Sequence, residues 1–331
     1  MIEKYYSGVI EQIYNRIGKE TRNIVMANYS NDFSIENLEV IRRYQSNEDN
    51  VFFAYSEFSY NTLVGAYEPF LDIICNMHRR FIGGSFDDFQ KECGVYYLHR
   101  QVLNSYYETG ECFREETVLL NEVAYEQRRM TMAIADMLKK LSEVKPLMIV
   151  INRFQMASKS SIETIKYLID NPCAHIGIVL GVNAIVKGTD STVEVWDRIV
   201  ESLEDRSAIY YIGSAGPLKN NVKTTNDDEL YITMNFEQSI QEASNIMEFL
   251  DFEQARRGCR IIEHKLKFED AWIDEKSLRR FYMVYARTSV LLGEMSKAIE
   301  LTNEYKALIP ENDSEHYLSL YYFMKGTCYM Y

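Results

Sequence analysis

The stretch that decides the fold is KPLMIVINRFQMASKSSIETIKYLIDN, residues 145–171. Its lysine–proline pair ends the preceding helix, and LMIVI (147–151) is an unbroken apolar run rich in isoleucine and valine. Such a run is typical of a strand buried on both faces of a parallel sheet. A serine-rich turn follows, which can cap a helix that begins near residue 159. The segment therefore predicts a strand–turn–helix unit of an α/β fold.

Strands and helices alternate on both sides of this unit. Towards the N-terminus the patterns predict a helix over 1–18, a strand over 23–27, a helix over 34–44, a strand over 51–56, a helical region over 67–107 and a long helix over 115–143. Towards the C-terminus they predict a helix over 159–170, a strand over 175–182, a helix over 192–204 and a strand over 208–213. We therefore expect an α/β domain over 1–235, with a parallel sheet flanked by helices.

The strand signals stop beyond Phe236, and two helical hairpins take their place. LDFEQA (250–255) joins the helices of the first and LGEMSKA (292–298) those of the second, so Ala255 and Ala298 lie 43 residues apart. This spacing is similar to that of helical repeats such as tetratricopeptide-like hairpins. A third copy begins at His316 and stops before its second helix. The sequence thus predicts an all-α repeat domain over 236–331 that continues past the end of this chain.

Composition excludes several classes of function. The chain has 331 residues with 49 acidic and 36 basic side chains, a net charge of −13, which disfavours direct contact with nucleic acid. Its six cysteines are scattered and form no Cys-x-x-Cys pair, so neither a metal site nor a disulfide framework is expected. There is no signal-peptide pattern, and the apolar run at 147–151 is too short to span a bilayer. We expect a cytoplasmic protein without a membrane partner.

Three segments together resemble one family, the AAA-related STAND class of signal-transduction NTPases. That family's second nucleotide motif is an apolar strand followed by a loop of the form Leu-His-Trp-Ala-Asp-x-x-Ser and a helix. The matching loop residues here are Phe154, Gln155, Met156, Ala157 and Ser161. A second match is Tyr67, Pro69 and Phe70, which open a helix after the second strand. The third is NIVMANYSNDFSIENLEV (23–40), where the family has its phosphate loop. The resemblance implies a P-loop-NTPase-like sheet followed by helical repeats.

The chain departs from the family where the nucleotide chemistry would be. Asn152 and Arg153 occupy the positions of the two acids that hold magnesium and polarise water, and an arginine repels the cation. The phosphate loop lacks both glycine and lysine: with Ser34 in the terminal Ser/Thr position, Asp32 falls on a glycine and Phe33 on the lysine. Ser34, Asn152 and Arg153 are therefore the positions of a degenerate nucleotide site. We assign no catalytic residue, no metal ligand and no cofactor, with ATP and Mg²⁺ the ligands to test.

Three hypotheses for function remain open. The preferred one is a regulatory scaffold, a pseudo-NTPase coupled to a repeat domain that binds a protein or peptide and relays a signal to an output domain outside this chain. By the same resemblance, that output is a DNA-binding helix-turn-helix or a signalling enzyme. The second is an ATP-binding switch without efficient hydrolysis, and the third is an ATPase with an unconventional site. Oligomeric state stays open, a homo-oligomer included.

Aromatic side chains of the repeat domain are the candidate partner-binding residues. They are Tyr282, Tyr285, Tyr321 and Tyr322. Tyrosine is enriched among the residues that dominate binding energy, which favours a role as anchors. At helical spacing, the alternative is that they fill the space between neighbouring helices.

Overall fold

The computed structural model describes residues 2–30, 38–46, 50–59, 63–114, 122–183, 193–213, 235–268, 273–310 and 314–330. The chain forms two compact units. The first comprises 1–60, 67–100 and 128–225, and the second comprises 61–66, 101–127 and 226–331. The expectation of a single domain boundary near residue 235 stays a prediction. Two early segments, 61–66 and 101–127, group with the helical unit, which the hydrophobic patterns did not indicate.

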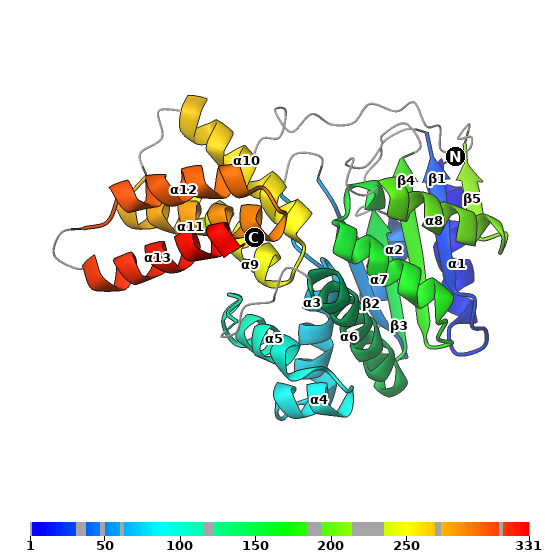
Figure 1. The fold of residues 1–331 in the computed structure, drawn as a ribbon. Coiled ribbons are helices and arrows are strands. Elements are labelled where there is room, and N and C mark those ends of the chain that lie inside the picture. Colours follow the sequence, from blue (N-terminus) through cyan, green and yellow to red (C-terminus); the bar gives the residue numbers. More distant parts are fainter. Residues whose placement is uncertain are drawn as a thin grey trace. The chain divides into compact units, whose positions relative to one another are not determined.

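The first unit is built on a five-stranded sheet in which every pairing is parallel (Figure 1). Its strands are β1 (Ile24–Tyr29), β2 (Phe52–Glu57), β3 (Leu147–Asn152), β4 (Ile176–Asn183) and β5 (Ile209–Ile212), in the order β2-β3-β4-β1-β5. Every residue of β3 and β4 is buried, as the apolar runs in their sequences require. The prediction of a parallel sheet flanked by helices is confirmed.

The helices of this unit follow the predicted alternation with one difference. They are α1 (Ile2–Arg16), α2 (Glu39–Ser46), α3 (Phe70–Met77), η1 (His78–Ile82), α4 (Phe86–Glu92), α5 (Tyr97–Thr109), α6 (Val123–Val144), η2 (Phe154–Met156), α7 (Lys159–Asp170) and α8 (Val193–Glu204), with parts of α5 and α6 in the second unit. The helical region predicted over 67–107 is interrupted. After the π-helical turn η1, Gly83 and Gly84 have φ of 68° and 71°, which ends the helix there.

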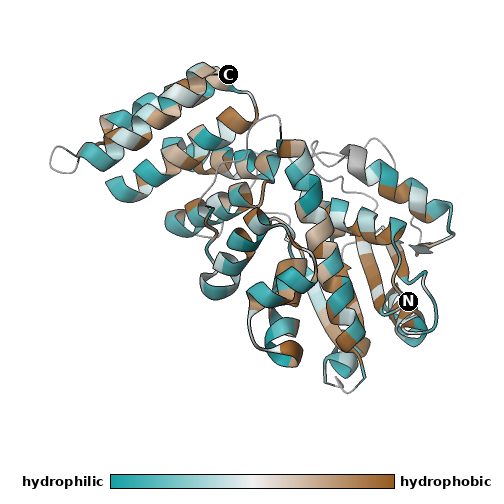
Figure 2. Cartoon of the chain, turned by 60° about the horizontal axis from the view of Figure 1, so that its bottom comes forward, coloured by the Kyte–Doolittle hydropathy of each residue, from teal (hydrophilic) through white to brown (hydrophobic). Residues whose placement is uncertain are grey.

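The two faces of the sheet carry different helices. The connections from β3 to β4 and from β4 to β5 move along the sheet in one direction, and the connection from β1 to β2 moves in the opposite direction. Because such crossovers are right-handed in about 98% of cases, α2 lies on the face opposite α7 and α8, which pack side by side (Figure 1). Helix α1 shares the face of α2, and the core between them and the sheet includes Tyr6, Ile10, Ile13, Val25, Tyr29, Ile41, Phe53 and Val150. In Figure 2 hydrophobic colour concentrates on the strands, whereas the helices carry both hydrophilic and hydrophobic residues.

The second unit contains five further helices: α9 (Phe236–Glu248), α10 (Phe252–Phe268), α11 (Glu275–Leu291), α12 (Met295–Ala307) and α13 (Ser314–Met330). The predicted connectors, 250–255 and 292–298, overlap the turns between α9 and α10 and between α11 and α12, but most of their residues belong to α10 and α12. Asn235 opens α9 with a capping box: its side chain accepts from the Gln238 N–H (2.9 Å) and its own N–H donates to Gln238 Oε1 (3.4 Å). The helical character of this region is confirmed.

Side chains of α9 and α10 bind the backbone of the early segments. The Asn245 amide accepts from the Cys112 N–H (2.9 Å) and donates to the Gly110 carbonyl (3.0 Å). In the same way, Gln254 donates to the carbonyl of Val64 (3.0 Å). Buried backbone groups need such partners, so these amides fix the backbone at Val64, Gly110 and Cys112, which lie outside the helices and strands.

A buried ion pair strengthens the same junction. The Arg114 side chain is 2% exposed and the Glu248 side chain 8%, with Arg114 Nε 3.8 Å from Glu248 Oε2. Arg114 Nη2 also donates to the Glu248 carbonyl (2.9 Å), and Arg287 Nη1 lies 3.0 Å from Glu248 Oε1. Burial lowers the pKa of Arg114, and the carboxylate of Glu248 opposes that effect. Glu248 therefore compensates the desolvated positive charge of Arg114.

Candidate functional site

In an open α/β sheet, the ligand crevice lies at the carboxyl ends of neighbouring strands whose connections leave on opposite faces. Here these strands are β1 and β4, since β1 leads to α2 on one face and β4 to α8 on the other. The residues at this switch point are Asn28 and Tyr29 on β1 and Asn183 on β4, with Asn152 at the end of β3. Ser34 lies outside the described residues, as do the rest of 31–37 and 184–192.

A buried polar contact lies at this end of the sheet. The Tyr29 hydroxyl donates to Asn152 Oδ1 at 2.6 Å, and both residues are fully buried. Gly181 on β4 permits this contact: a Cβ there would lie 2.5 Å from Tyr6 Oη and 2.8 Å from Asn152 Oδ1. Burial raises the pKa of Tyr6, so this group is a neutral phenol at neutral pH. Asn152 thus accepts from a phenol hydroxyl, and Gly181 leaves room beside it for the hydroxyl of Tyr6.

Arg153 is directed towards the neighbouring strand β2. Its backbone is left-handed, with φ of 54°, in the turn before η2. Its Nη1 lies 3.0 Å from Glu57 Oε1 and donates to the Phe58 carbonyl at 3.4 Å. The side chains of Arg153 and Glu57 are 22% and 18% exposed. The positive charge that the sequence places at this edge is therefore balanced by Glu57, a partner that sequence reasoning missed although it ends the adjacent strand.

The loop after β3 connects two of the segments that carry the family resemblance. Ser158 caps α7, Ser160 Oγ accepts from the Tyr67 N–H (3.0 Å), and Ser161 Oγ donates to the Glu68 carbonyl (2.8 Å). Gln155 is fully buried, and its Oε1 accepts from the Asn183 N–H at 3.2 Å. The serine-rich turn thus ties α7 to the start of α3, and Gln155 ties the loop to the end of β4.

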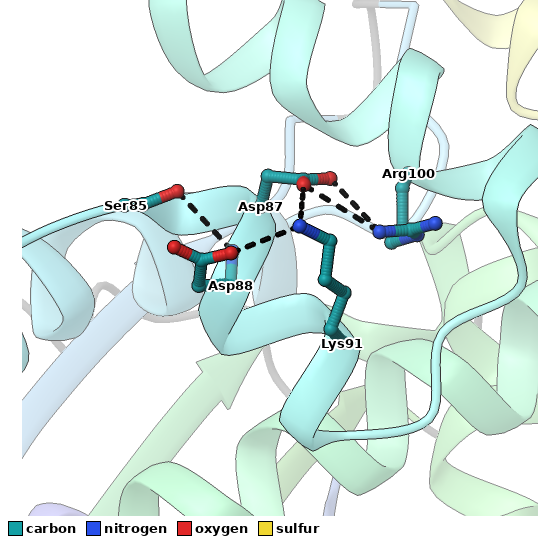
Figure 3. A network of polar contacts seen from close by, with 5 residues as sticks. All are labelled: Ser85, Asp87, Asp88, Lys91 and Arg100. Atoms are coloured by element: carbon teal, nitrogen blue, oxygen red, sulfur yellow. Dashed lines mark hydrogen bonds and ion pairs between the residues drawn. The ribbon is translucent and has the colours of Figure 1, made fainter.

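The paired carboxylates Asp87 and Asp88 have a structural role at the start of α4 (Figure 3). Ser85 Oγ accepts from the Asp88 N–H (3.2 Å) as the N-cap. Lys91 Nζ bridges Asp87 (2.7 Å) and Asp88 (2.9 Å), and Arg100 Nη1 lies 3.2 Å from Asp87. These hydrogen bonds raise the pKa of Lys91. Negative charge at a helix start is also stabilised by the helix dipole.

The four tyrosines of the repeat prediction differ in exposure. Tyr285 is 3% exposed and Tyr321 2%, and the two rings contact neighbouring aromatic rings or lysines inside the helical unit. Tyr282 is half-buried beside Phe281, whereas Tyr322 is 63% exposed on α13. Burial raises the pKa of Tyr285 to about 12. A role in partner binding stays a prediction, and Tyr322 is the most accessible of the four.

Within the ranges that the structure describes, no cluster of three or more His, Cys, Asp or Glu side chains could hold a metal ion. No helix among those same residues is long and apolar enough to cross a membrane.

Comparison with known proteins does not assign a family. No protein-family model matches this sequence, and no curated protein matches it. The crevice, its buried contacts and the exposed helix surface are therefore the guides to function.

Buried thiols predict a loss of stability in alkali. Burial raises the pKa of Cys75 and of Cys93 to about 12, and it raises the pKa of Cys112 and Cys259 as well. In the unfolded chain these thiols ionise near pH ~8.5, so proton loss then favours unfolding. Their contribution to stability is complete below that pH and declines as pH rises towards their folded pKa. We expect the urea midpoint to fall between about pH 7.5 and about pH 10.

The matched comparison is the slope of that decline in Cys75→Ala and Cys259→Ala, which remove one titrating thiol from each unit. Over this pH interval, the urea midpoint of each variant should fall by less than that of the wild-type protein. Equal slopes in all three proteins would contradict the assignment to thiols.

Proposed function

We propose that this chain is a non-hydrolysing regulatory scaffold, in which a degenerate NTPase-like α/β unit is joined to a helical unit that binds a protein or peptide. It acts through protein contacts and relays a signal to an output domain outside the chain.

The observation that carries the proposal is the state of Asn152. A residue at this position that held magnesium would offer a charged oxygen to the crevice, since Mg²⁺ favours carboxylates. Asn152 is a neutral amide, fully buried, and its oxygen accepts the Tyr29 hydroxyl at 2.6 Å. The cationic residue beside it, Arg153, is paired with Glu57 at 3.0 Å. These contacts support a site whose polar groups serve the fold.

The connection from β1 to α2 supports the same conclusion. Between Asn23 and Ile41 the sequence contains no glycine, no lysine and no arginine. A phosphate loop needs glycines so that backbone N–H groups can surround the phosphates, and a lysine to neutralise them. Phosphoryl transfer depends almost entirely on such positioning and charge, which favours a protein without this activity.

The surface of the helical unit supports a role in protein binding. Helix α13 exposes a row of large apolar side chains at helical spacing: Tyr322 (63%), Phe323 (56%), Tyr329 (70%) and Met330 (80%). Exposed apolar patches of this kind are typical of interaction sites. An ATP-binding switch remains the second candidate, because α/β crevices at such positions are common ligand sites.

The deciding experiment is a calorimetric titration of the purified chain with ATP, ADP and GTP, each with and without Mg²⁺. We expect no saturable heat up to millimolar nucleotide and no phosphate release. An active ATPase titrated under the same conditions is the positive control. Micromolar binding that Ser34→Ala or Asn152→Ala abolishes would replace the proposal with the nucleotide switch. Turnover lost in those variants would establish an unconventional ATPase.

A further inference from the structure

The last helix of the helical unit, α13, is apolar on two opposite sides. Its inner side, which includes Tyr321, Met324 and Cys328, is buried. The helix packs against α11 and α12 (Figure 1), and Lys306 of α12 lies 5.2 Å from the centre of the Tyr321 ring. A helix that is apolar on all sides is typical of a helix that is buried on all sides. The described residues cover the inner side of α13, so its other side is available to a partner.

The opposite side of α13 forms an exposed apolar face. This outer face consists of Tyr322, Phe323, Gly326, Tyr329 and Met330, which follow one another at helical spacing. Its four large side chains are each more than half exposed. Within the described parts of α9–α12, by contrast, no large apolar side chain is exposed. The outer face is therefore a distinct surface of the helical unit rather than the ordinary scatter of single apolar residues.

The outer face is symmetric about its glycine. Two large side chains precede Gly326 by three and four residues, and two follow it by three and four. An antiparallel copy of α13 that crosses at Gly326 would place Phe323 against Tyr329 of the partner subunit. It would place Tyr322 against Met330 of the partner subunit in the same way. This is the self-complementary arrangement of a two-fold interface. A Cβ at Gly326 would meet no atom of its own chain within 4 Å, so the crossing point is open to a second backbone.

Charge favours a second copy of this chain over a charged partner. Between 317 and 330 the single charged residue of the sequence is Lys325. Its Nζ donates to Tyr321 Oη at 2.9 Å and lies over the same ring, so this charge belongs to the flank next to the inner side. The chain has a net charge of −13, and two copies repel one another unless they meet where charge is absent. An acidic or basic partner would gain no attraction on the outer face.

The area of the outer face fits a weak dimer. An aromatic side chain buries about 150–250 Å² when it leaves water completely. At their present exposure, the four large side chains offer about 500 Å² in each copy, or about 1,000 Å² in a pair. That area is the lower limit for a specific interface, and interfaces of this size are weak or transient.

We propose that the outer face of α13 is the interface of a weak homodimer, in which two α13 helices cross antiparallel at Gly326. The apolar side chains supply the affinity, and their symmetric spacing sets the register. The inference rests on the proposed function, because it names a second copy of this chain as the protein partner of the helical unit. The area corresponds to a dissociation constant on the order of 10 μM. Association then depends on the local concentration of the chain.

Sedimentation velocity of the full chain tests the proposal. We expect a shift from monomer to dimer between about 1 and about 100 μM protein. Tyr329→Glu and Phe323→Lys each place a charge without a partner in the interface, and each should weaken association by about tenfold or more. Both side chains are exposed in the monomer, so the circular dichroism spectrum and the urea midpoint should stay unchanged. Tyr5→Glu makes the same change at a similarly exposed tyrosine of α1 and should leave the dissociation constant unchanged.

A mixture of the two charge variants tests the antiparallel register. In the mixed dimer, the lysine introduced at position 323 faces the glutamate introduced at position 329, and the second Phe323–Tyr329 pair is unchanged. An equimolar mixture of Phe323→Lys and Tyr329→Glu should therefore associate about tenfold more tightly than either variant alone. A parallel pair of helices would bring each position against itself and form no such ion pair.

Three outcomes would overturn the proposal: a monomer throughout this concentration range, association that both charge variants leave intact, or a mixture that associates no better than its components. In the first case the outer face would belong to a different protein. The nucleotide titration is independent of these results. Saturable nucleotide binding by a dimer would overturn the proposed function alone, whereas a monomer without nucleotide binding would overturn this inference alone.

Discussion

Replacement of Glu248 by glutamine is expected to lower the free energy of unfolding by about 3 kcal/mol. The glutamine keeps the shape of the side chain and removes the negative charge. Arg114, whose side chain is 2% exposed, then retains a positive charge in a low-dielectric environment without its nearest carboxylate. Urea unfolding followed by circular dichroism measures the loss, and the transition of the helical unit should shift.

Two matched variants sharpen this prediction. Glu237→Gln makes the same change on an exposed position of the same helix, α9, and should alter stability by less than about 0.5 kcal/mol. The double variant Glu248→Gln/Arg114→Met removes both charges and should recover much of the lost stability, because no uncompensated charge stays buried. A double variant as unstable as Glu248→Gln alone would show that the ion pair is not the cause.

The second large effect is expected at Gly181. An added methyl group would lie 2.5 Å from Tyr6 Oη and 2.8 Å from Asn152 Oδ1, in the central strand β4. Neither neighbour can move without disturbing α1 or the Tyr29–Asn152 hydrogen bond. Gly181→Ala should therefore cost about 1–3 kcal/mol, as overpacking of cores does. Thermal and urea unfolding of the full chain measure the change.

A double-variant cycle tests the named contact. Tyr6→Phe removes the hydroxyl that the new methyl group would meet, so Gly181→Ala should cost less in the Tyr6→Phe background than in the wild type. The matched glycine control is Gly8→Ala in α1, where an added Cβ meets no atom within 4 Å. That change should stabilise the chain by up to about 1 kcal/mol, because alanine favours helix. Equal costs of Gly181→Ala in both backgrounds would exclude the Tyr6 contact.

The sequence predicted the bounds of an element well where the spacing of its apolar residues and its capping residues agree. Helix α7 begins and ends as its pattern indicates, at Lys159 and Asp170, because Ser158 caps one end and an apolar strand precedes it. The region 67–107 was less predictable. Its apolar spacing is helical throughout, and only Gly83 and Gly84, with positive φ, divide it.

The sequence predicted which residues lie at the site better than it predicted which residues they contact. The positions of Asn152 and Arg153 follow from the end of an apolar strand. Tyr29, the partner of Asn152, ends β1, 123 residues earlier in the chain. Glu57, the partner of Arg153, ends β2, the strand next to β3. Only the strand order of the sheet brings these residues together. Arg114 illustrates the same limit, because a lone arginine in a polar stretch gives no sign that it will be buried beside Glu248.

The division of the chain has a consequence for its synthesis on the ribosome. The chain passes between the two units five times, after residues 60, 66, 100, 127 and 225. Arg114 leaves the ribosome 134 residues before Glu248. At typical elongation rates that interval is on the order of 10 s. During it, segment 101–127 has neither the amide of Asn245 nor the carboxylate of Glu248 to bind. The helical unit therefore assembles only after α9 has been translated, and segment 101–127 stays without these partners until then.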